Sequence, residues 1–166
     1  MTITKKYNQK SDIFFLQVCG LRINSYIAQE ILNLFDLKNI IVYIEYLSEE
    51  SELFNLLNRK KIAYFKEMSK EFNGTFLVIP YDDFSDLITE FDIFDDNDVI
   101  IMPTVDSSLF NNREKFIELM NYQKKDYFWG SCSIEIDDYE NRIKIYIKNK
   151  TYNFDSIYES LKNILK

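Results

Sequence analysis

Eight carboxylates lie in one stretch of this chain with no lysine or arginine among them: residues 79–98, which read IPYDDFSDLITEFDIFDDND. Carboxylate oxygens are the ligands that Mg²⁺ and Ca²⁺ prefer, and a dense group of them also attracts cationic proteins. The formal net charge of the chain is −7, so the acidity is confined to this stretch and the other residues together are close to neutral. The stretch is therefore the first candidate for a functional site.

An amphipathic helix is predicted inside the stretch, because apolar residues recur at helical spacing: Phe84, Leu87, Ile88 and Phe91. Asp83 and Asp86 fall on its solvated face and suit a helix N-terminus. Glu90 and the acids after it lie at or beyond the C-terminal end, where the helix dipole disfavours negative charge. A surface that docks a basic protein would account for them. Two aromatic residues, Tyr81 and Phe94, would serve as anchors of this surface. The full set of predicted contact residues is Tyr81, Asp83, Asp86, Glu90, Asp92, Phe94, Asp95, Asp96 and Asp98.

A second interpretation makes some carboxylates ligands of Mg²⁺ in a small hydrolase or transferase. The candidate ligands follow predicted strands, where open α/β sheets place their ligands: Asp82, Asp83 and Asp106, with Ser107 and with Ser48 or Glu45 beside them. No calcium-loop pattern is present. Acidic and hydroxyl residues at such places are more often helix caps than ligands, so this interpretation ranks second.

Several common chemistries are excluded by composition. The chain has no histidine, which removes the usual serine and cysteine triads and the zinc sites that contain histidine. Two cysteines are too few for a four-cysteine zinc site, and three glycines could hardly build a phosphate-binding loop. The sequence therefore favours protein binding over catalysis, with no cofactor expected.

The elements that must position these residues alternate along the first two thirds of the chain. Strands are predicted at 12–20, 39–47, 74–80 and 98–103, with helices between them and a further helix over 111–124. Residues 60–72 fit either a continued helix or an extra edge strand, KIAYFKE, and the helix is preferred. Such alternation predicts an α/β fold with a mainly parallel sheet.

The last third predicts an antiparallel hairpin followed by a closing helix. A turn at 138–141 would pair Asp137 with Arg142 and Glu135 with Lys144 on one face, and isoleucines with isoleucines on the other. The pattern does not reveal which sheet edge the hairpin joins. An α+β fold, with helices on one face of a mixed sheet, is therefore the alternative.

Length and composition predict one globular domain over residues 1–166, with residues 1–11 a candidate flexible N-terminus. No apolar stretch is long enough to span a membrane, and two distant cysteines suit the reducing cytoplasm. The negative charge makes nucleic acid a poor partner. The expected function is that of an inhibitor or immunity-type protein that neutralises a basic partner such as a toxin. A structural or regulatory domain is the remaining alternative, and the oligomeric state is not predicted.

Overall fold

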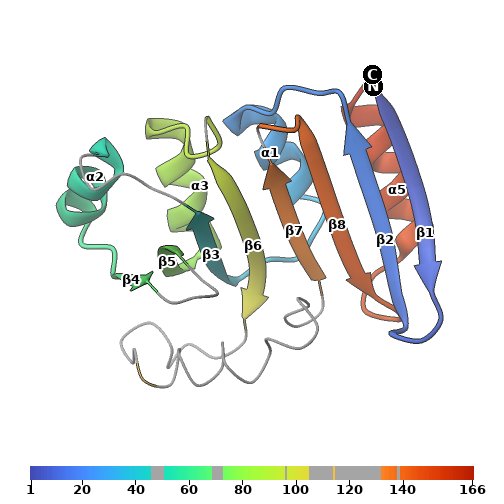
Figure 1. Ribbon diagram of the computed structural model, residues 1–166, viewed down its shortest axis with the longest axis horizontal. Coiled ribbons are helices and arrows are strands. Elements are labelled where there is room, and N and C mark those ends of the chain that lie inside the picture. The colour runs from blue at the N-terminus through green and yellow to red at the C-terminus, as the bar shows by residue number, and fades with distance from the viewer. Residues whose placement is uncertain (46–50, 69–72, 96, 105–113, 115–131, 138) are drawn as a thin grey trace.

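The computed structural model describes residues 1–45, 51–68, 73–95, 97–104, 114, 132–137 and 139–166. The strands are β1 (Thr2–Asn8), β2 (Ile13–Cys19), β3 (Asn39–Glu45), β4 (Tyr64–Met68), β5 (Asn73–Pro80), β6 (Asp98–Thr104), β7 (Cys132–Asp137) and β8 (Arg142–Lys148). The helices in this part of the chain are α1 (Ser25–Leu32), α2 (Glu52–Lys60), α3 (Tyr81–Glu90) and α5 (Phe154–Ile164). The strands form one sheet in the order β1-β2-β8-β7-β6-β3-β5-β4 (Figure 1).

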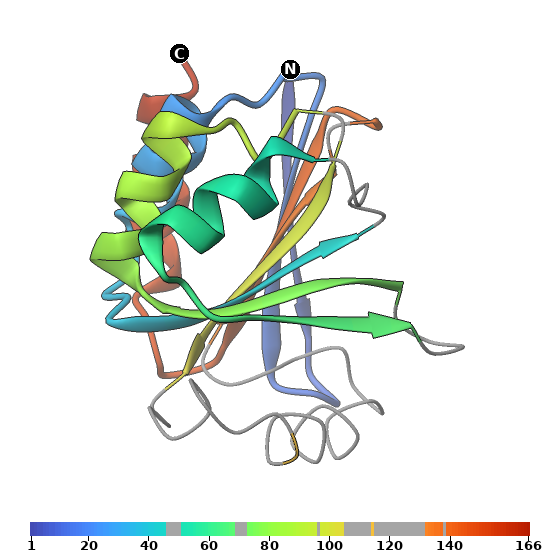
Figure 2. The ribbon, with the colours of Figure 1, turned by 90° about the vertical axis from the view of Figure 1, so that its left-hand side faces the viewer.

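The prediction of a mainly parallel sheet is wrong, because every pair of neighbouring strands is antiparallel. The helical connections do join strands that point the same way: β3 and β4 through α2, and β5 and β6 through α3. In both cases a third strand lies between the two, β5 in the first and β3 in the second. Helices α1, α2, α3 and α5 lie on one face of the sheet (Figure 2), so the fold is α+β. The alternative fold anticipated helices on one face but expected a mixed sheet.

Both edges of the sheet differ from expectation. At one edge, residues 64–68 form β4, so the preference for a continued helix over 60–72 is wrong. Helix α2 ends because Lys61 adopts the left-handed conformation, with φ at +57°, and the chain then turns toward β4. At the other edge, β1 lies inside the segment proposed as a flexible N-terminus and pairs with β2 along its whole length.

The predicted C-terminal hairpin is confirmed in its register. Asp137 faces Arg142 and Glu135 faces Lys144, and both pairs are ion pairs with an N–O distance of 2.6 Å. The hairpin joins the sheet between β6 and β2, which places it in the interior of the sheet. The closing helix is α5, whose side chains Ile157 and Leu161 are buried against the sheet.

The main core lies between the sheet and the helices, where alternate strand residues meet the apolar helix faces. The opposite face of β3, β5 and β6 also carries buried side chains: Ile41, Tyr43, Phe76, Val78 and Met102. Gly74 of β5 lies close to this second group. A Cβ atom at Gly74 would clash with the backbone oxygen of Ile44 and lie 2.6 Å from Cε2 of Tyr43, so the close approach of β3 requires glycine.

Some predicted features lie outside the described residues. They are the helix over 111–124 apart from Glu114, and the candidate site residues Ser48, Asp96, Asp106 and Ser107. In the part of the chain that the structure describes, no helix is long and apolar enough to cross a membrane.

Candidate protein-docking surface

Helix α3 carries the first half of the acidic stretch and begins directly after Pro80. Its apolar side, Phe84, Leu87 and Ile88, is buried in the main core. Asp82 and Asp83 lie in the first turn, where the helix dipole favours negative charge, and Pro80 offers no side-chain cap. Asp82, Asp83 and Asp86 are exposed. Within the described residues, none of these three carboxylates forms an ion pair. We call them the acidic α3 face.

Helix α1 lies beside α3 and runs antiparallel to it. Gln29 Nε2 donates a hydrogen bond to Ser85 Oγ, and the Tyr81 hydroxyl donates to Asn33 Oδ1 at 2.8 Å. Tyr26 precedes Gln29 by three residues, so it shares the side of α1 that meets α3. Its side chain is 71% exposed, which makes it an aromatic residue available to a partner on the helix beside α3. Half-burial and the neighbouring Asp82 raise the pKa of Tyr81 to about 12.

Three of the predicted contact acids form hydrogen bonds or ion pairs with other residues of the same chain. Glu90 forms ion pairs with Arg59 at 2.9 Å and with Lys60 at 2.5 Å. The hydrogen bond from Lys60 is the main reason that the pKa of Glu90 is lowered. Asp95 pairs with Arg22 at 3.3 Å, and Asp92 accepts a hydrogen bond from the backbone N–H of Phe94 at 3.2 Å. These contacts account for acids that helix stability alone did not explain.

Two other predicted contact residues do not lie on this surface. Phe94 is fully buried in the main core, so it is not available as an anchor. Asp98 lies on the face of the sheet opposite the helices, directly across from Asp137 of β7. Burial raises the pKa of Asp98 to about 6, and the charges of Asp137, Glu45 and Glu135 add to the rise.

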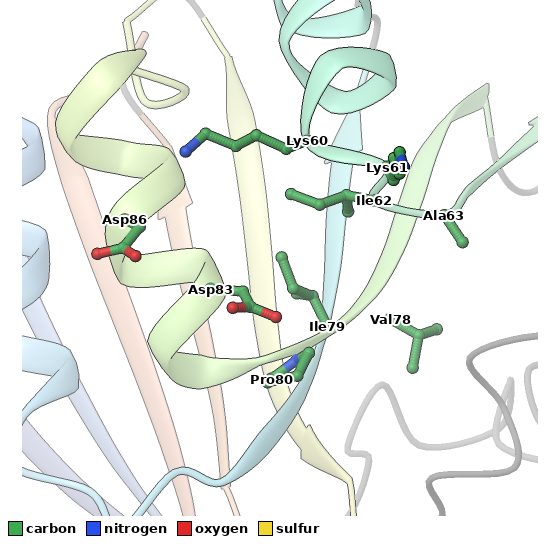
Figure 3. Close-up of a pocket in the computed structure, with 9 residues that line it drawn as sticks. All are labelled: Lys60, Lys61, Ile62, Ala63, Val78, Ile79, Pro80, Asp83 and Asp86. Atoms are coloured by element: carbon green, nitrogen blue, oxygen red, sulfur yellow. The ribbon is translucent and has the colours of Figure 1, made fainter.

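An open groove of about 400 Å³ separates the acidic α3 face from the end of α2 (Figure 3). Asp83 and Asp86 line it on the α3 side, and Lys60 and Lys61 line it on the α2 side. Apolar side chains such as Ile62 and Ile79 lie between the two charged rims. The groove could therefore take the aliphatic stem of an arginine or lysine whose charged end reaches the carboxylates.

The metal interpretation gains no support from the described geometry. Asp82 and Asp83 follow the C-terminal end of β5. Glu45 is the last residue of β3, which runs antiparallel to β5. Glu45 therefore pairs with Gly74, at the N-terminal end of β5 and away from Asp82 and Asp83. Across the described ranges, no group of three or more acidic or cysteine side chains is placed to hold a metal ion. Asp106 and Ser107 lie outside those ranges.

Sequence reasoning did not identify Tyr26 or the three cations that neutralise later acids of the stretch. Arg22, Arg59 and Lys60 are 73, 31 and 30 positions away from the acids they meet, so only the fold brings them together. A single exposed tyrosine in a helical pattern gives no signal in a sequence. Comparison of this chain with protein-family models, with curated proteins and with solved structures gives no match.

Proposed function

We propose that this protein binds a cationic protein through the acidic α3 face and Tyr26, in the manner of an inhibitor or immunity-type protein that neutralises a basic toxin. The proposal rests on one observation: some acids of the stretch form ion pairs within the chain, and others do not. Glu90 and Asp95 have cations within the chain, whereas Asp82, Asp83 and Asp86 are exposed without one in the described residues. Carboxylates left open in this way offer a partner a negative surface, bordered across the groove by Lys60 and Lys61.

The neighbouring features suit a protein partner better than a small cation. Tyr26 provides a large ring for an anchor contact, and the groove beside Asp83 provides an apolar floor for a long basic side chain. The chain has only two cysteines, far apart in the sequence, which agrees with action in the cytoplasm. Among the described residues, no comparable observation favours catalysis.

The test compares four bait proteins in a pull-down from the native host, of which the fourth carries Tyr26→Ala. The first is the wild type, and the second carries Asp82→Asn, Asp83→Asn and Asp86→Asn. The third is a control with the same change in charge at exposed acids elsewhere: Glu52→Gln, Asp155→Asn and Glu159→Gln. A basic protein retained by the wild type and the control, and lost from the second bait and from Tyr26→Ala, is the expected result.

Thermal unfolding of every bait is measured first. Loss of two acids from the first turn of α3 should cost about 1 kcal/mol of stability, which leaves the protein folded. Equal recovery of the same basic protein by all folded baits would contradict the proposed surface.

A further inference from the structure

A second groove, of about 530 Å³, lies far from the acidic α3 face, at the edge of the sheet formed by β1 and β2. Its walls come from β1, the start of β2, the connection from β8 to α5 and the first turn of α5. In Figure 1 these segments lie at the opposite side of the sheet from α2 and β4. We call it the basic groove.

Positive charge gathers at the basic groove although the whole protein is acidic. Lys5, Lys6 and Lys150 line it. Lys5 lies on the α5 side of β1, whereas strand alternation places the side chains of Lys6 and Lys148 on the other face of the sheet. Two carboxylates offset part of the charge: Asp155, which also lines the groove, and Asp12 in the turn between β1 and β2. Asp155 meets Lys5 at 3.8 Å, and Asp12 accepts hydrogen bonds from the Tyr7 hydroxyl and the Asn149 amide. Those bonds, with smaller contributions from Lys150 and Lys148, lower the pKa of Asp12.

Aromatic rings form the other part of the lining. The rings of Phe14 and Phe154 are stacked with centroids 4.3 Å apart, and Tyr7 extends the group with its ring 4.5 Å from Phe14. Tyr7 is 44% exposed, so part of this aromatic surface is open to a ligand. The first turn of α5 adds the positive end of a helix dipole. Aromatic surface beside lysines suits a ligand with a planar ring and an anionic group.

Lysines on an edge strand have an ordinary use, because they prevent pairing with another sheet edge. That explanation covers Lys5 and Lys6 of β1 but not Lys150, which lies in the turn between β8 and α5. Lys150 has φ at +68°, a left-handed conformation that glycine or asparagine adopts at lower cost. The edge-strand explanation therefore leaves the charge of Lys150 at the groove unaccounted for.

We propose that the basic groove binds a small phosphate ester with a planar ring, of which a nucleoside monophosphate is the simplest example. Lys5 and Lys150 contact the phosphate, and Tyr7 and Phe154 contact the ring. This site is separate from the docking surface and does not depend on the proposed function. The structure offers a matched control, because Lys61 is also left-handed and lines the groove beside α3.

The test is titration of the ¹⁵N-labelled full chain with adenosine monophosphate, adenosine and inorganic phosphate. We expect saturable amide shifts around Tyr7, Phe14, Lys150 and Phe154 with the nucleotide, with a Kd of about 1 mM or tighter, and weaker binding of the two fragments. Lys150→Gly should unfold at the same or a higher temperature than the wild type, and should raise Kd about five- to tenfold. Lys61→Gly should leave Kd unchanged.

Lys150→Asn provides a second variant, because asparagine also tolerates the left-handed conformation. No shifts at the groove, or the same Kd in the wild type and both Lys150 variants, would overturn the proposal. Inorganic phosphate bound as tightly as the nucleotide would also overturn it, since the rings would then contribute nothing. Weaker binding of the nucleotide at higher salt is the further result expected of a lysine-based site.

Discussion

Asp98 is surrounded by groups that oppose its ionisation. It faces Asp137 across the β6–β7 pair, Glu45 and Glu135 lie on neighbouring strands, and Lys144 is the one cation that acts against them in the described surroundings. The pKa of Asp98 in the folded state is about 6, above the value of 3.8 for an unperturbed carboxyl group. The folded state therefore binds the proton more tightly than the unfolded state does. This contribution to stability is complete below about pH 4 and is lost as the pH rises through about 6.

Replacing Asp98 with asparagine should remove this dependence on pH, because the amide resembles the protonated acid. The variant should exceed the wild type in free energy of unfolding at pH 8, and the two should be similar at pH 4. Solvent screens the half-buried carboxyl, so we expect a gain of about 1 kcal/mol at pH 8. Urea denaturation at both pH values measures it. A difference that does not change with pH would show that the Asp98 charge has no such effect.

Only part of the candidate site could be predicted from its residues before the fold was known. The acidic helix, its buried side and its exposed Asp83 and Asp86 follow from helical periodicity, which is a local property. The burial of Phe94 and the engagement of Glu90 do not follow, because they depend on segments distant in the chain. A count of charges in sequence therefore overestimates the acidic surface.

At the scale of elements, the β7–β8 hairpin was fully predictable because all its information is local. The side chains alternate with a period of two, and the charges and isoleucines of both strands fit one register. The direction of the remaining strands was not predictable in this way. Strand–helix–strand alternation shows that two strands point the same way, but not that a third strand lies between them. Strand β1 was missed, and β4 was only the less preferred alternative, because solvent-exposed edges lack a strong apolar alternation.

The hairpin itself depends on the Asp137–Arg142 pair. Asp137 is buried and accepts hydrogen bonds from Arg142 at 2.6 Å and from the backbone N–H of Glu140 at 2.8 Å. Arg142→Met should destabilise the protein by about 1–3 kcal/mol, since it leaves Asp137 without its cation and close to Asp98.

Adding Asp137→Asn to Arg142→Met should recover part of this loss, because the uncompensated charge is removed. A double-mutant cycle by urea denaturation measures the coupling between the two residues. Additive effects would mean that the ion pair does not stabilise the hairpin.

At the scale of the whole molecule, the charge is separated between two surfaces. The acidic α3 face lies among the helices near the middle of the sheet, and the basic groove lies at the β1 edge (Figure 1). A cationic partner should be attracted to the first and repelled by the second. The separation of charge therefore favours approach of the partner with its basic surface toward the acidic α3 face. It should raise the rate of association more than it lengthens the lifetime of the complex.

This separation predicts different effects of charge removal on the two surfaces. Once the basic partner is isolated, neutralising Asp82, Asp83 and Asp86 should reduce its association rate constant by about tenfold at low salt, and the remaining rate should depend little on salt. Neutralising Lys6 and Lys150 should leave the rate unchanged or raise it slightly, because these lysines repel the partner from a distance. Stopped-flow or surface-binding kinetics at about 0.05 M and about 0.5 M salt, which change the screening length severalfold, separate the two cases. Equal losses of rate from both sets of variants would show that the partner responds to the general surface of the protein and not to the acidic α3 face.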